Sequence, residues 1–308
     1  MTLDCSVMET HEIDPVHSTA TELSRTAFVG LSAAALGGAA SAKAFAQAEL
    51  GKAHSPLVAE NDSAIMTATV SLTRPDGNIT AYTATPKDAT ANTPGIVVVM
   101  HIWGVDTSIR DVVRRFAKQG YVAIAPDLFG RFGAPSGDNQ TDYKPFQALA
   151  QKLDTKQVDG DIRAAAQWIL ASHPNAKIGV TGFCMGGRIA LRQTVDNGDI
   201  FSAAAIWYGA VRNVTGGPTG NEGPVESALA YTDQIHIPIE GNYGERDTGI
   251  LAADVRAFQQ RLRVPNDIKI YPEAGHGFFD DQRSSYVPSA ASDAWSRTLA
   301  FFAKYLKS

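Results

Sequence analysis

The chain has 308 residues, 44% of them hydrophobic, and a formal net charge of −5. That length and apolar content are enough for one large globular domain, and they argue against disorder over most of the chain. The mild acidity and the lack of a basic stripe argue against a nucleic-acid-binding protein.

The first 47 residues have the pattern of an export signal. Residues 1–26 are polar, and residues 27–46 are apolar, rich in Ala and Gly, and end on a small-x-small cleavage pattern. Ser24-Arg25-Thr26-Ala27-Phe28 is similar to the twin-arginine export consensus, with Thr26 in place of the second arginine. We expect residues 1–47 to be a cleaved signal recognised by export machinery, and the mature protein to be periplasmic or secreted without stable membrane insertion. General secretory export and a disordered leader of a cytoplasmic protein are the alternatives.

Residues 48–63 are expected to form a flexible linker, and residues 64–308 a single folded domain. Apolar and polar residues alternate over 64–72 and again over 79–84, and Pro75-Asp76-Gly77-Asn78 between them is typical of a turn. This pattern predicts a β-hairpin at a sheet edge.

Strand patterns then alternate with helical patterns to the end of the chain. This order predicts an α/β fold with a doubly wound, mostly parallel sheet. The expected strands are 95–100, 121–125, 177–182, 202–208, 236–241 and 268–271, and the expected helices are 107–119, 143–153, 155–171, a helix from 185, 248–263 and 289–306. Residues 212–226 are rich in Gly, Pro and Asn, so they are either a candidate lid or a solvated insertion without a role.

The segment Gly182-Phe183-Cys184-Met185-Gly186 follows the nucleophile-elbow pattern, with Cys where Ser is usual. In an elbow the backbone of the central residue is strained so that its side chain stands clear of the sheet. The residues two positions before and after it must then lack a Cβ. The helix N-terminus would lower the pKa of the thiol. The alternative is that Cys184 is a small buried hydrophobe in a tight turn.

Two residues farther along the chain favour the nucleophile interpretation. Asp247 and His276 each follow an expected strand, so the order nucleophile, acid, histidine is that of hydrolases with this elbow. Parallel sheets place their sites at the ends of the strands. Cys5 lies in the expected signal, so the mature chain would hold one cysteine and no internal disulfide. The candidates do not have metal-ligand spacings, and no cofactor is expected.

Four segments in the right order resemble the dienelactone hydrolase (carboxymethylenebutenolidase-like) family: Val98–Val105, Gly120–Arg131, Val180–Gly187 and Glu273–Phe279. The resemblance covers roughly residues 64–306. It implies an α/β-hydrolase fold without a large cap domain. It also implies hydrolysis of a small ester or lactone through a Cys-His-Asp triad and a thioester acyl-enzyme.

The resemblance also implies a role for each matching residue. Cys184 is the expected nucleophile, His276 the general base and Asp247 the residue that orients the base. The backbone N–H groups of Ile102 and Met185 are the expected oxyanion donors. Thiolate attack, oxyanion stabilisation and hydrolysis of the acyl-enzyme are the steps such a set can perform.

The expected substrate-binding residues include two departures from the family pattern. His101 stands where the founding enzymes have a glutamate that holds the resting thiol. It either stabilises the thiolate as a cation, holds the thiol as a neutral partner, or is an ordinary pocket histidine. Arg131 matches one of two arginines that grip a substrate carboxylate, whereas Asp280 replaces the other. That replacement should weaken carboxylate binding, unless Arg283 compensates from the next turn.

Two aromatic residues and two alternative functions complete the sequence-based predictions. Trp103 and Phe278 either line the pocket or pack in the core. One alternative function is a hydrolase or isomerase of a different small carbonyl compound that uses the same elbow. The other is a non-catalytic small-molecule-binding or thiol-sensing protein on a hydrolase scaffold.

Overall fold

The computed structural model describes residues 56–140, 142, 144–212 and 227–308. The expected export signal and nearly all of the candidate lid lie outside these described residues. Within them, no helix combines the length and the apolar character that crossing a membrane requires.

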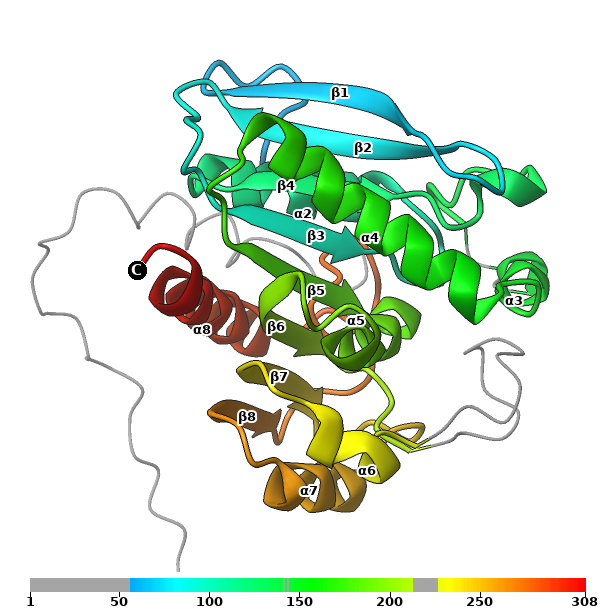
Figure 1. Cartoon of the computed structure of the whole chain (residues 1–308). Helices are drawn as coiled ribbons and strands as arrows, with labels where there is room; N and C mark the ends of the chain where they lie inside the picture. Colours follow the sequence, from blue (N-terminus) through cyan, green and yellow to red (C-terminus); the bar gives the residue numbers. More distant parts are fainter. Residues whose placement is uncertain (1–55, 141, 143, 213–226) are drawn as a thin grey trace, which may run out of the picture. The chain divides into compact units, whose positions relative to one another are not determined.

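The described residues form an eight-stranded mixed sheet in the order β1-β2-β4-β3-β5-β6-β7-β8 (Figure 1). β1 pairs antiparallel with β2, and β2 antiparallel with β4, while the pairs from β4 to β8 are parallel. The predicted edge hairpin and the predicted doubly wound, mostly parallel sheet are therefore confirmed. The strands are β1 Ile65–Leu72, β2 Ile79–Pro86, β3 Gly95–Val99, β4 Val122–Pro126, β5 Ile178–Phe183, β6 Phe201–Trp207, β7 Ile239–Gly244 and β8 Asn266–Tyr271.

Helices connect the parallel strands, as the alternation of patterns predicts. Asp106 is the N-cap of α2, because its carboxylate accepts a hydrogen bond from the N–H of Ile109 at 3.1 Å. The helices are α2 Thr107–Lys118, α3 Lys144–Ala150, α4 Thr155–Ser172, α5 Met185–Asp196, α6 Ala228–Tyr231, α7 Ala252–Arg261 and α8 Pro288–Leu306, with 3₁₀ turns η1 Gly130–Phe132 and η2 Thr232–Gln234. The short elements α6, η1 and η2 are not anticipated by the sequence patterns.

Two glycines of the central strands show how α4 and α8 pack on opposite faces of the sheet. A Cβ on Gly95 would lie 2.8 Å from Ile169 of α4, and a Cβ on Gly179 would lie 2.7 Å from Phe302 of α8. Gly179 is the register partner of Ile96, the residue after Gly95, and successive residues of a strand face opposite ways. In Figure 1, α4 and α5 lie in front of the sheet.

Strand β7 differs from the prediction. The apolar pattern places a strand at 236–241, but β7 runs from Ile239 to Gly244. Pro238 cannot donate a ladder hydrogen bond, so pairing begins after it. Glu240 and Asn242 are buried, and their side chains have partners in α8, with Thr298 donating to Glu240 at 2.8 Å. Buried polar residues are stable when they have hydrogen-bond partners, but they interrupt the apolar pattern from which a strand is predicted.

The described part of the expected flexible linker is held against α2. The N–H groups of Leu57 and Val58 donate to the carboxylate of Asp111 at 3.0 and 2.9 Å. Arg114 donates to the Val58 carbonyl at 2.6 Å and forms an ion pair with Glu60. Residues 57–60 are therefore bonded to the domain, contrary to the expectation of flexibility.

Candidate active site

Cys184 occupies a sharp turn between β5 and α5. Its backbone has φ 57° and ψ −117°, in a region that L-residues rarely adopt. Its N–H donates to the carbonyl of Trp207, the last residue of β6, at 3.0 Å. Such strain persists only where the surroundings enforce it, and it is common at functional sites.

Two glycines allow the elbow to close. A Cβ on Gly182 would lie 2.1 Å from the carbonyl oxygen of Gly186, and a Cβ on Gly186 would lie 2.3 Å from that of Met100. Both distances are far below van der Waals contact, so side chains at these positions would force the strand and the helix apart. This geometry agrees with the prediction that the elbow requires residues without a Cβ at positions 182 and 186.

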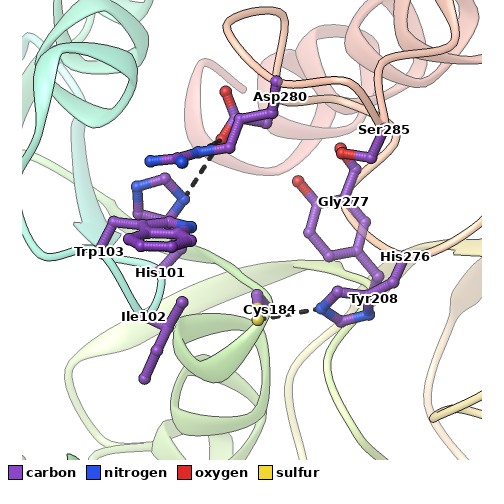
Figure 2. A pocket seen from close by; sticks show the side chains of 10 residues that line it. His101, Ile102, Trp103, Cys184, Tyr208, His276, Gly277, Asp280 and Ser285 are labelled. Carbon is purple, nitrogen blue, oxygen red and sulfur yellow. Dashed lines mark hydrogen bonds and ion pairs between the residues drawn. The ribbon is translucent and has the colours of Figure 1, made fainter. Parts of the chain in front are cut away.

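The structure brings together Cys184, His276 and Asp247, which are far apart in the chain. His276 Nε2 lies 3.0 Å from the Cys184 sulfur (Figure 2). His276 Nδ1 lies 2.7 Å from Asp247 Oδ2. The other oxygen of Asp247 accepts hydrogen bonds from the N–H groups of Gly249 and Ile250, at 2.8 and 3.0 Å. Asp247 is only 5% exposed, so its carboxylate is fixed from both sides.

The thiol and the imidazole favour each other's charged forms. Burial acts to raise the pKa of Cys184, but His276, His101 and the N–H of Met185 outweigh it, so the pKa is lowered. Burial acts to lower the pKa of His276, but Cys184 and Asp247 outweigh it, so the pKa is raised. The His276 side chain is 42% exposed, so water screens part of this attraction. The arrangement favours a thiolate–imidazolium pair.

A pocket of about 330 Å³ opens over the sulfur. Such a volume is at the lower end of small-molecule sites. The lining residues are His101, Ile102, Trp103, Cys184, Tyr208, His276, Gly277, Asp280, Arg283 and Ser285. In Figure 2, His276 faces the sulfur, while His101 and Trp103 lie across from it and Asp280 lies above them.

His101 is held between two carboxylates. Its Nε2 lies 2.9 Å from Asp106 Oδ1, and its Nδ1 lies 3.6 Å from Asp280 Oδ2. Burial acts to lower the pKa of His101, but Asp106 and Asp280 outweigh it and raise the pKa despite an opposing effect of Arg283. The side chains of His101, Asp106 and Asp280 are nearly inaccessible to water. The geometry therefore favours a cationic His101.

Among the described residues that line the pocket, Arg283 is the one arginine. It lies over the Trp103 ring, with Cζ 4.0 Å from the ring centroid. It also forms ion pairs with Asp280 at 3.3 Å and Asp106 at 3.4 Å. Trp103 itself lines the pocket and makes an edge contact with Phe146.

Two expected substrate-binding residues lie elsewhere. Arg131 is not among the lining residues; its guanidinium is paired with Asp161 of α4 and donates to the carbonyl of Gly77 at 3.2 Å. Phe278 is fully buried and packs against Tyr208 and other aromatic rings. The expectation that Arg131 contacts substrate in this pocket is corrected, because Arg131 joins η1 to α4. Of the two alternatives for Phe278, the structure shows packing in the core.

The sequence reasoning missed three residues of the site. Tyr208 follows β6 with φ 38°, lines the pocket, and its ring centroid lies 5.2 Å from that of His276. Ser285 lines the pocket and donates to the carbonyl of Gly277 at 3.0 Å. Asp106 is recognisable in the sequence only as a helix cap. Position after a strand is the one signal that points to Tyr208, because sites gather at strand ends.

Among the described residues, no group of three or more His, Cys, Asp or Glu side chains is arranged to hold a metal ion. Ile102 lines the pocket, and the N–H of Met185 favours the thiolate. Their role as oxyanion donors stays a prediction.

Comparisons with known proteins agree on one family. The family profile described as "Dienelactone hydrolase family" matches residues 79–306. A protein of Escherichia coli K12 named "Putative carboxymethylenebutenolidase" is 36% identical over 255 residues, covering 82% of this chain and 92% of its own length. A protein of the same name from Methylorubrum extorquens is 33% identical, covering 80% of this chain and 84% of its own. The crystal structure titled as a putative dienelactone hydrolase from Klebsiella pneumoniae is 35% identical with a TM-score of 0.69, covering 79% of this chain and all of that one.

Proposed function

The chain belongs to the dienelactone hydrolase family and is a hydrolase of small esters or lactones, and on that premise we propose that Cys184 is its nucleophile. The observation that carries the proposal is the 3.0 Å approach of His276 Nε2 to the Cys184 sulfur, with Asp247 on the other ring nitrogen. Nucleophile, base and orienting acid within hydrogen-bond reach are the requirement for covalent catalysis.

In the first half of the proposed reaction, the thiolate of Cys184 attacks the carbonyl carbon of the substrate. The carbonyl electron pair moves to oxygen, where the N–H groups of Met185 and Ile102 are proposed to stabilise it. One such donor contributes about 3–4 kcal/mol in other hydrolases. Collapse of this intermediate breaks the bond to the leaving oxygen, which takes the proton from His276 Nε2. The product is a thioester on Cys184 and an alcohol, which in a lactone stays part of the same molecule.

In the second half, water attacks the thioester carbonyl. His276, now neutral, accepts a proton from that water, and Asp247 stabilises the imidazolium that results. Collapse expels the thiolate and releases the carboxylic acid. The enzyme returns to the thiolate–imidazolium pair, so no external oxidant or reductant is required.

The direct test is to trap the acyl-enzyme. The full-length protein is mixed with 4-nitrophenyl acetate, quenched in acid within milliseconds to seconds, digested and analysed by mass spectrometry. We expect acetylation of the peptide that contains Cys184, loss of the label in neutral hydroxylamine, and no turnover by Cys184→Ala. The Cys5→Ala variant is the matched control and should behave as wild type. Equal turnover by Cys184→Ala and wild type would remove Cys184 from its proposed role.

We also propose that the enzyme is exported through residues 1–47, on the basis of the apolar stretch and the small-x-small pattern that ends it. Expression of the full chain in a bacterial host, followed by fractionation and N-terminal sequencing, tests this. A periplasmic product that begins near residue 48 is expected. A cytoplasmic product that retains Met1 would contradict it.

A further inference from the structure

The charge balance of the pocket suggests which substrates it accepts. A substrate that carries a carboxylate needs an available cation, and arginine is the usual partner of a carboxylate in proteins. Arg283 is the lining arginine of the pocket as the structure describes it. The state of its guanidinium therefore decides whether an anionic substrate can be bound.

Each nitrogen of the Arg283 guanidinium already has one partner. Its Nε faces Asp280 at 3.3 Å, its Nη2 faces Asp106 at 3.4 Å, and its Nη1 donates to the Gln140 carbonyl at 2.6 Å. One of its faces is covered by the Trp103 ring at 4.0 Å. A substrate carboxylate would have to share this guanidinium with the two buried carboxylates of Asp106 and Asp280.

The surrounding charges cancel. Asp106 and Asp280 supply two negative charges, and His101 and Arg283 supply two positive charges, so the four groups together are neutral when ionised. Asp106 and Asp280 are 4% and 6% exposed, and the accessible wall of the pocket is mostly apolar. An anion that entered would lose its water without gaining an uncompensated cation, and a loss of that kind is costly.

We propose that this pocket selects esters or lactones whose acyl part is uncharged, and that Asp280 determines this specificity by neutralising Arg283. This inference rests on the proposed hydrolase site and names its substrate class. Asp280 acts here as a specificity residue and takes no part in bond making. Replacing its charge frees Arg283 to attract an anionic acyl group.

The test compares two esters that differ in one charge. 4-Nitrophenyl methyl adipate and mono-4-nitrophenyl adipate present the same reacting carbonyl, and only the second carries a carboxylate. We expect kcat/KM of the full-length enzyme to favour the neutral ester by about tenfold or more at low ionic strength. Asp280→Asn, which keeps the size of the side chain, should reduce this preference at least about threefold, mainly through a lower KM for the anionic ester.

The Asp293→Asn variant is the matched control, because it removes one negative charge from α8, outside the pocket. Its preference should equal that of wild type. A wild-type ratio near one, a preference for the anionic ester, or an unchanged ratio in folded Asp280→Asn would overturn the proposal.

A second measurement separates this proposal from the proposed function. Alkylation of Cys184 by neutral iodoacetamide and by anionic iodoacetate requires access to the pocket but no turnover. The rate of Cys184 alkylation by iodoacetamide is divided by the rate with iodoacetate, and the same ratio is measured for free cysteine. We expect the ratio for Cys184 to be about tenfold higher than the ratio for free cysteine. If neither ester is hydrolysed while this preference holds, the proposed function fails and the charge selection stands. Equal relative rates with the two reagents would sink the charge selection even in an active enzyme.

Discussion

The Gly186→Ala variant tests how closely the elbow must pack. The new Cβ would lie 2.3 Å from the carbonyl oxygen of Met100 and 2.4 Å from that of Val99, both at the end of β3. Ordinary contact distances are about 3.5 Å, so α5 and β3 must separate by roughly 1 Å. Overpacking of this kind costs about 1–3 kcal/mol, within a total stability of about 5–15 kcal/mol, so the variant should still fold.

Activity should fall more than stability. The residues after β3 carry His101 and Ile102 into the pocket, and α5 carries Cys184 at its N-cap. A displacement of about 1 Å between a nucleophile and its partners costs on the order of 100-fold in rate. We therefore expect kcat/KM for a nitrophenyl ester to fall about 100-fold and Tm to fall by about 2–4 °C for each kcal/mol lost.

Ester hydrolysis and thermal unfolding measure the two effects on the same sample. Gly275→Ala is the control, because its Cβ would lie 3.8 Å from the nearest carbonyl and its backbone is not left-handed. It should match wild type in both measurements. Wild-type activity and Tm in Gly186→Ala would refute the claim that the elbow depends on this close approach.

Four further outcomes are expected. Asp247→Ala should lower kcat/KM by about 10³-fold or more, because His276 loses the partner of Nδ1, and the effect should appear in kcat without a matching rise in KM. Alkylation of Cys184 by iodoacetamide should remain fast as the pH falls from 9 to 7, because its lowered pKa keeps the thiolate populated below the range where a free thiol protonates. His276→Ala should return that pH profile toward free cysteine, and a profile unchanged by it would contradict the ion pair. Arg115→Ala should lower the free energy of unfolding in urea by about 3–5 kcal/mol, because two buried carboxylates, including Asp281, lose their shared cation; a loss below about 1 kcal/mol would contradict this.

Several features of this protein follow from local sequence. The elbow is recognisable because a strained residue between a strand and a helix imposes glycines at fixed spacings, and this chain has them at Gly182 and Gly186. The strands and long helices follow from periodic burial. The order of Cys184, Asp247 and His276 points to one site because parallel strands end at the same edge of a sheet.

Two predictions failed because they depended on pairing between distant segments. Arg131 stands in a family-like motif, yet Asp161 of α4 takes its guanidinium. Strand β7 continues past its predicted end at Gly241 because Arg297 and Thr298 of α8 bond the buried side chain of Asn242. A single sequence gives no sign of these partners.

Local backbone geometry and the order of the motifs along the chain were enough to predict the fold class and to single out Cys184, His276 and Asp247. The charge of the pocket became apparent only in the folded arrangement. Asp106, which caps a helix, turns out to hold His101, and Arg283 is neutralised by Asp280 while it lies on Trp103. Electrostatic interactions depend on distances between side chains and on their burial, and both exist only after the chain has folded.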